Sequence, residues 1–131
     1  MTIESLHPEG WPRPRGYSNG IVGTGRILFV AGQIGWTPLG VFEKKDLVGQ
    51  FDQALANVLT IVESAGGTSA SIARLTVYVT DLDAYRSSLK AIGEVWRRRI
   101  GKVFPAMALV GVAGLVERDA LVEIEATAVL D

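Results

Sequence analysis

The sequence predicts a single α+β domain whose elements follow the order β-β-α-β-α-β-β. Two stretches carry apolar residues at spacings of three and four, and several shorter stretches are rich in β-branched and aromatic residues. Polar or glycine-rich turns separate them, and no internal repeat is visible. The 131 residues, taken as one domain over 1–131, fit ordinary domain size. We therefore expect one sheet with two helices on one of its faces.

The chain begins with a proline-containing segment. Residues 1–16 hold three of the five prolines and are predicted to form an irregular arm. Residues 17–22 and 26–34 are β-rich, and the Gly-Thr-Gly sequence at 23–25 between them is typical of a hairpin turn. Gly32 inside the second run indicates a bulge, or a close approach by a ligand or another backbone.

Two helices are predicted further along the chain. The first covers residues 46–65, where Asp46 caps the start and two glycines follow the end. The second covers residues 80–99, where Thr80 and Asp83 have the spacing of a capping box. The apolar face of the second helix consists of Tyr85, Leu89, Ile92 and Trp96.

Three more strands are predicted around and after the second helix. Residues 72–80 and 121–130 alternate between apolar and polar side chains, which is typical of strands with one covered face. Residues 106–113 are apolar at nearly every position. The polar stretch GLVERDA joins the last two runs, so we expect them to pair as a hairpin.

The runs ILFVAGQI and AMALVGVA are apolar on both faces, although two helices cover only one face of a sheet. The second face then needs another cover. A further copy of the same chain is the expected partner, because closed symmetric homo-oligomers are the common arrangement. A cleft between subunits would be a natural ligand site.

Composition excludes several classes of function. Cysteine is absent and His7 is the single histidine, so disulfides, Cys- or His-built metal sites and a Ser-His-Asp triad are not expected. The formal net charge of −1 provides no positive field for a nucleic acid. The apolar run 103–116 is too short to span a bilayer, and the N-terminus lacks the pattern of a signal peptide. We expect a cytoplasmic protein without nucleic-acid or membrane partners.

Paired carboxylates are the main candidate for chemistry. Glu123 and Glu125 are two residues apart on a predicted strand, so both point to the side opposite Val122 and Ile124. A carboxylate in a cleft between subunits can move protons. A solvated strand face is the competing interpretation.

Six segments in order along the chain carry a resemblance to a known family: RGYSNGI, LFVAGQIG, QALANVLTIVESAGG, ARLTVYVTDLDAY, FPAMALVGVAGL and VEIEATAV. Together they resemble the Rid family, the reactive-intermediate deaminases also called RidA or YjgF proteins. The resemblance covers residues 16–130 and implies a chorismate-mutase-like α+β fold, a homotrimer with a central barrel, and three clefts between subunits. It also implies hydrolysis of enamines and imines to a carbonyl compound and ammonia without metal or cofactor.

The resemblance also assigns site residues. Glu123 matches a glutamate that positions water and moves protons, Tyr17 matches a tyrosine of the cleft, and Gly32 matches a glycine whose backbone contacts substrate. Three positions differ from the family pattern: Met107 stands where an arginine grips the substrate carboxylate, Leu109 where a cysteine is usual, and Leu89 where an asparagine is usual.

The missing arginine leaves the carboxylate anchor open. Arg74, Arg26 and Arg118 are candidates to replace it, although Arg118 falls on a predicted exposed turn. Methionine supplies only soft packing, whereas a guanidinium binds a carboxylate through directional, charge-assisted hydrogen bonds.

The family resemblance, together with the apolar residues at these positions, therefore favours a cofactor-independent deaminase of an enamine, imine or amino-dienoate that is more apolar than 2-aminoacrylate. A non-catalytic trimer that binds a small molecule, or has a regulatory role, is the alternative. A ribonuclease or translation inhibitor fits less well, because the charge balance includes no basic stripe.

Overall fold

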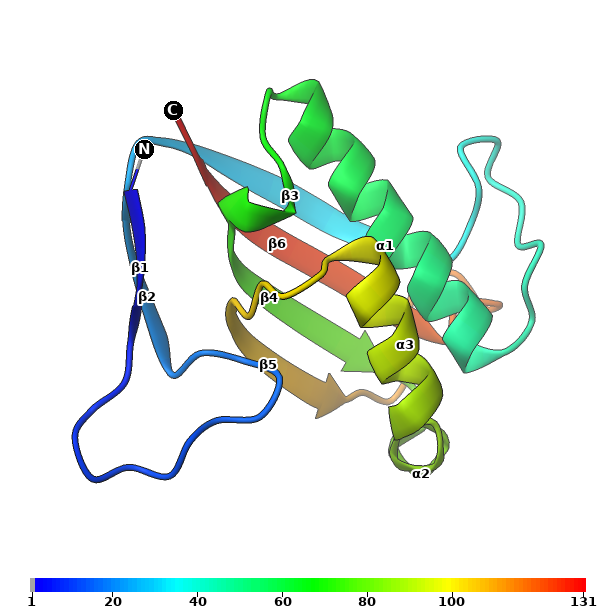
Figure 1. The fold of residues 1–131 in the computed structure, drawn as a ribbon. Helices are drawn as coiled ribbons and strands as arrows, with labels where there is room; N and C mark the ends of the chain where they lie inside the picture. The colour runs from blue at the N-terminus through cyan, green and yellow to red at the C-terminus, as the bar shows by residue number, and fades with distance from the viewer. Residues whose placement is uncertain (1) are drawn as a thin grey trace.

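A computed structural model describes residues 2–131, whose main feature is a four-stranded sheet in the order β3-β6-β4-β5. Helices α1 and α3 lie against one face of this sheet (Figure 1). A two-stranded ribbon of β1 and β2 crosses one end of the sheet (Figure 1). The expected α+β fold is confirmed. The elements are β1 Thr2–Leu6, β2 Gly20–Thr24, β3 Arg26–Ile34, α1 Leu47–Ser64, η1 Ser69–Ser71 (a 3₁₀ turn), β4 Ile72–Val79, α2 Leu82–Ser87, α3 Leu89–Arg99, β5 Ala106–Gly111 and β6 Val122–Leu130.

The first helix forms where its local signals place it. Asp46 is the N-cap and accepts a hydrogen bond from the backbone N–H of Gly49 at 3.2 Å. Gly66 follows the C-terminus with φ +89°, a left-handed conformation that favours glycine. The apolar stripe packs on the sheet, with Phe51, Leu55 and other residues of α1 almost fully buried.

The second helix is broken into α2 and α3, which the sequence did not predict. Ser88 lies between them with φ −112° and ψ 12°, and its hydroxyl donates to the carbonyl of Ala84. Asp81 caps α2 through the N–H of Ala84 at 3.0 Å, so the prediction of Thr80 as cap was wrong. Thr80 is held by the sheet instead, because its N–H donates to the carbonyl of Leu121.

The predicted hairpin between the last two strands was also wrong. β5 pairs in parallel with β4, while β6 lies between β3 and β4 and is antiparallel to both. Parallel neighbours need a crossover connection, and α2 and α3 supply it between β4 and β5. In this central position Val122 and Ile124 of β6 are completely buried, whereas Val110 of the edge strand β5 is exposed.

The third correction concerns the N-terminal strands. Only Gly25 separates β2 from β3, so the expected hairpin between them does not form; β2 pairs with β1 and β3 pairs with β6. Gly25 has φ +146°, and a Cβ there would lie 2.1 Å from the carbonyl oxygen of Leu130, so only glycine fits this bend. The arm is not irregular from its start, because β1 precedes the first proline.

The sheet has one covered and one open face. Leu75, Val77 and Ile124 point toward the helices and are fully buried. On the other face Phe29 is 78% exposed, and Ile27 and Val110 are also exposed. This matches the expectation that the strands are apolar on two sides. Across residues 2–131, no helix is both long and apolar enough to cross a membrane.

Candidate functional site

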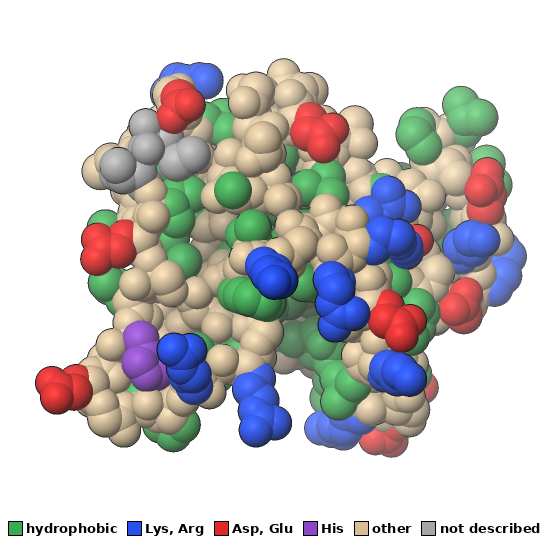
Figure 2. Space-filling model, in the orientation of Figure 1, with side chains coloured by type: hydrophobic (Ala, Val, Ile, Leu, Met, Phe, Trp, Pro, Cys, Tyr) green, Lys and Arg blue, Asp and Glu red, His purple; other side chains and the backbone are tan. Residues whose placement is uncertain are grey.

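A cavity of about 550 Å³ lies between α3, β5 and the loop before β2. Four of the six expected site residues line it: Tyr17, Leu89, Met107 and Leu109. Figure 2 shows hydrophobic side chains in a hollow on the helix side of the molecule, with Lys and Arg side chains around it. The residues that complete the lining are Arg15, Gly16, Phe51, Tyr85, Ile92, Gly93, Trp96, Arg97, Gly101, Lys102 and Phe104.

Strand β5 supplies the floor of the cavity. Met107 and Leu109 are in register with Leu75 and Val77 of β4, so all four side chains point to the helix side. Leu89 and Trp96 of α3 face them at helical spacing. The floor is therefore apolar, as expected from the residues at these positions.

The loop before β2 is fastened beside β5 through Ser18. Its N–H donates to the carbonyl of Pro105 at 3.0 Å, and its hydroxyl donates to the carbonyl of Phe104. The hydroxyl of Ser5 donates to that of Ser18 at 2.8 Å, which ties β1 to the same point. These contacts place Tyr17 and Arg15 at the mouth of the cavity.

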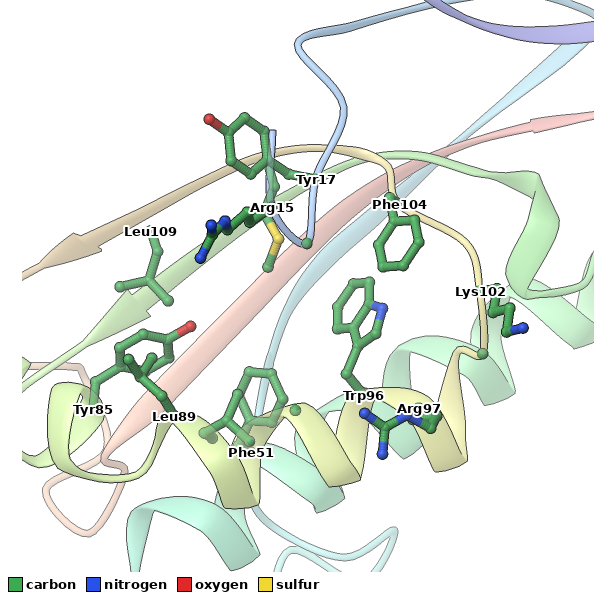
Figure 3. Close-up of a pocket in the computed structure, with 15 residues that line it drawn as sticks. Arg15, Tyr17, Phe51, Tyr85, Leu89, Trp96, Arg97, Lys102, Phe104 and Leu109 are labelled. Atoms are coloured by element: carbon green, nitrogen blue, oxygen red, sulfur yellow. The ribbon is translucent and has the colours of Figure 1, made fainter. Parts of the chain in front are cut away.

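Aromatic side chains form much of the remaining wall (Figure 3). The indole N–H of Trp96 donates to the carbonyl of Val103 at 3.2 Å, which holds the segment before β5 against α3. Tyr85 lies on the opposite wall, and its burial raises the pKa of its hydroxyl above the ordinary value. Its side chain lies at the end of the cavity that Leu89, Leu109 and Arg15 also line (Figure 3).

The other two expected residues, Glu123 and Gly32, lie together on the open face of the sheet. A Cβ built on Gly32 would be 2.4 Å from Oε2 of Glu123, so the carboxylate rests on the glycine backbone. The pairing of β3 with β6 is interrupted between Val30 and Gln33, which confirms the expected irregularity at Gly32. Within residues 2–131, no side chain donates a hydrogen bond to Glu123.

Glu125 shares the open face but is engaged by a neighbour. The hydroxyl of Tyr78 donates to its Oε1 at 2.8 Å, and this hydrogen bond raises the pKa of Tyr78. Glu125 also lines a second hollow of about 300 Å³ with Arg74 and Phe29. The two glutamates therefore share a face, as the alternation of the strand predicts, but only Glu123 lies against Gly32.

The expected residues are thus divided between two faces of one sheet. Tyr17, Leu89, Met107 and Leu109 meet on the helix side, while Glu123 and Gly32 meet on the other side. As for metals, the described part of the chain contains no group of three or more His, Cys, Asp or Glu residues that could hold an ion.

Comparison with known proteins identifies the family. A family model described as Endoribonuclease L-PSP matches residues 12–130. The chain is 34% identical to a RutC family protein of Pyrococcus horikoshii over 126 residues, covering 95% of this chain and 96% of the relative. It is 36% identical to a 2-iminobutanoate/2-iminopropanoate deaminase of Escherichia coli over 108 residues, covering 82% of this chain and 83% of the relative.

A solved structure of a Rid family protein has the same fold as this chain. YyfB from Yersinia pestis, titled a protein of unknown function of the conserved Rid family, is 33% identical with a TM-score of 0.89. The match covers 99% of this chain and 100% of YyfB. The chain belongs to the Rid family.

None of the three arginines considered from the sequence lines the Met107 cavity of this Rid protein. Arg26 donates from Nε to the carbonyl oxygen of Asp131 at 2.5 Å, far along the sheet. Arg74 lies on the open face beside Glu125, and Arg118 is exposed in the β5–β6 connection.

Sequence reasoning missed the cations that do line the cavity, Arg15, Arg97 and Lys102. Arg97 is the first of three consecutive arginines in the last turn of α3. Its neighbours Arg98 and Arg99 bind Asp52 of α1 at 3.0 and 2.6 Å. The signal that could have found Arg15 is its position two residues before Tyr17, which the family resemblance assigns to the cleft.

Proposed function

We propose that this Rid protein hydrolyses a reactive enamine, imine or amino-dienoate to a carbonyl compound and ammonia, in clefts between the subunits of a homotrimer. The observation that supports this proposal is the position of the Glu123 carboxylate close over Gly32 on the open sheet face, where a Cβ on the glycine would collide with it. The relative named as an imine deaminase supports the same chemistry.

Assembly is part of the proposal because one copy holds the two groups of site residues on opposite faces. The cleft would combine the Tyr17–Met107 cavity of one subunit with Glu123 of the partner subunit. Phe29, Ile27 and Val110 support such an assembly, since the open face leaves them in water. The family resemblance makes three the expected number of copies.

The proposed reaction is the addition of water to an iminium carbon. The Glu123 carboxylate accepts a proton from water as the water oxygen bonds to that carbon, which gives a neutral carbinolamine. The carboxyl proton then moves to the nitrogen, the C–N bond breaks with its electrons on nitrogen, and the hydroxyl proton passes to Glu123. Ammonia takes that proton, so iminium and water become a carbonyl compound and ammonium.

The second candidate is a trimer that binds a small molecule without turning it over. The apolar lining of the cavity favours this second function. Where the family resemblance implies groups that recognise a carboxylate, this chain has Met107, Leu109 and Leu89. A thermal-shift screen separates the two functions, since a binder is stabilised by a compound that it never consumes.

Ammonia release from freshly generated enamines tests the enzymatic proposal, measured against the spontaneous rate without protein. We expect Glu123→Gln to lose the acceleration, by about 100-fold or more. Glu125→Gln is the matched control on the same strand and face, and it should keep the activity. Equal activity of both variants and the wild type would overturn the role of Glu123.

Light scattering tests the assembly. We expect a homotrimer at micromolar concentration. A stable single subunit at that dilution would contradict a site shared between copies, whatever the activity measurements show.

A further inference from the structure

The cavity beside Met107 has an uneven distribution of charge. Arg15, Arg97 and Lys102 line it, and no aspartate or glutamate does, although the whole chain has a net charge of −1. Within residues 2–131 none of these three cations makes an ion pair, whereas Arg98 and Arg99 are bound to Asp52. The charged side chains around the cavity are therefore all positive, which favours an anionic ligand.

We propose that Arg15 is the carboxylate anchor of this cavity, in place of the arginine that Met107 replaces, and that the ligand is a 2-imino or 2-oxo acid with a bulky apolar side chain. The assignment deepens the proposed function and rests on it for the reaction, while the binding of the acid depends on the cavity alone.

Position distinguishes Arg15 from the other cations. Its guanidinium lies between Tyr17 and Leu109, at the end of the cavity formed by β5 and the N-terminal loop (Figure 3). Arg97 and Lys102 lie toward the other end, near Trp96 and Phe104 (Figure 3). The anchor therefore sits beside the residues that the family resemblance assigns to substrate binding.

The loop that carries Arg15 is positioned by hydrogen bonds and not by its own regular structure. Ser18, three residues later, binds the backbone of Phe104 and Pro105 directly before β5. Arg15 is exposed, so its side chain is available to a ligand entering from solvent. A guanidinium can bind both oxygens of a carboxylate at once, which fixes the orientation of the ligand.

The remaining lining selects the rest of the ligand. Phe51, Leu89, Trp96 and Phe104 give apolar walls, and a volume of about 550 Å³ lies within the range of small-molecule sites. A three-carbon acid bound to Arg15 would leave most of this surface in contact with water. A phenyl or branched side chain would displace that water and gain the burial of apolar area.

Binding of 3-phenylpyruvate tests the proposal by isothermal titration calorimetry on the full chain. This 2-oxo acid represents the product class, so its binding can be measured without turnover. We expect Arg15→Ala to weaken its binding by about 10- to 100-fold, the range of a charge-assisted hydrogen bond. Arg15→Lys should fall between, because lysine keeps the charge but not the two-pronged geometry.

Two controls isolate the contact. Arg13→Ala removes the same charge from the same loop at a residue that does not line the cavity, and it should bind like the wild type. The neutral amide of 3-phenylpyruvate should bind weakly and equally to the wild type and Arg15→Ala. Thermal unfolding of each variant verifies that the fold is retained.

The outcomes separate this inference from the proposed function. Equal losses in Arg15→Ala and Arg13→Ala, or no binding of 3-phenylpyruvate to the wild type, would overturn the anchor even if deaminase activity is found. Pyruvate binding as tightly as 3-phenylpyruvate would overturn the bulky ligand class. Arg15-dependent binding in a protein that releases no ammonia from any enamine would uphold the anchor and reject the deaminase.

Discussion

The carboxylate of Glu123 lies so close over Gly32 that a single methyl group on the glycine would collide with it, at 2.4 Å from Oε2 and 2.8 Å from Cδ. Glycine at position 32 therefore leaves room for the carboxylate of Glu123 on the neighbouring strand. A substitution at Gly32 therefore tests the role of Glu123 without changing the glutamate itself.

Gly32→Ala should displace Glu123 without unfolding the protein. The obstructing atoms belong to a flexible side chain, so we expect the free energy of unfolding to change by less than about 1 kcal/mol. Ammonia release should fall about 100-fold, because small displacements of a catalytic group have effects of that order. Gly114→Ala is the control, since a Cβ there meets nothing within 4 Å. Full activity of Gly32→Ala would contradict the importance of this contact.

Gln50 should be among the most sensitive polar residues of the fold. Its side chain is 1% exposed, donates to the carbonyls of Lys44 and Asp119, and accepts from the N–H of Leu121. Gln50→Ala removes the side-chain partner of three part-buried backbone groups, and we expect it to lower the free energy of unfolding by about 2–4 kcal/mol, measured by urea unfolding. Gln53→Ala, on the outer side of the same helix, should cost less than about 1 kcal/mol. Similar losses would show that Gln50 does not connect α1 to the β5–β6 loop.

Asp52 should contribute a salt-dependent stabilisation. Its two oxygens bind Arg98 and Arg99, and its side chain is only 27% exposed. We expect Asp52→Asn to lower the free energy of unfolding by about 1 kcal/mol at low salt, and by less in 1 M salt. Asp83→Asn breaks an ion pair whose carboxylate is 92% exposed, and it should change little. An effect of Asp52→Asn that is independent of salt would argue against the ion pairs as its cause.

Tyr85 should make the fold less stable in strong alkali. Burial raises its pKa in the folded state above the unfolded value of about 10. The protonated form is thus favoured by folding, so its contribution is complete below pH 10 and is lost as the pH rises through the folded pKa. Tyr85→Phe should flatten the stability curve above pH 10.

The pKa of Tyr78 is raised as well, through its hydrogen bond to Glu125, so Tyr78→Phe is the necessary companion variant. Denaturant unfolding from pH 8 to 11 measures both. An unchanged alkaline slope in Tyr85→Phe would contradict the burial of its hydroxyl.

Met107→Arg should restore the family's cation at the cavity floor. Met107 and Arg15 line the same cavity, so a second guanidinium should raise the affinity for pyruvate about tenfold or more. Combined with Arg15→Ala, it should recover much of the lost carboxylate binding. Calorimetry with pyruvate and 3-phenylpyruvate checks both statements, and an Arg15→Ala defect that Met107→Arg leaves unrepaired would speak against a shared anchoring role.

Local signals in the sequence determined much of the fold. Asp46 and the glycines after α1 delimit that helix because capping depends on a few neighbouring residues. Alternation placed Glu123 and Glu125 on one face of their strand, since side chains two residues apart must share a side. The sequence also predicted that β3 and β5 are apolar on both faces, because their apolar residues stand at consecutive positions.

Tertiary structure alone decided which strands pair and which residues meet. The sequence of β5 shows that its side chains are apolar, but it does not show which strand is its hydrogen-bonded neighbour. The parallel pairing of β5 with β4 depended on the crossover through α3. The bend at Gly25 depended on the nearby carbonyl of Leu130. Arg15 reaches the Met107 cavity only because Ser18 binds the chain before β5, a contact between segments more than eighty residues apart. Propensity and periodicity act over a few residues, whereas a site joins distant segments through packing and hydrogen bonds that only the folded chain contains.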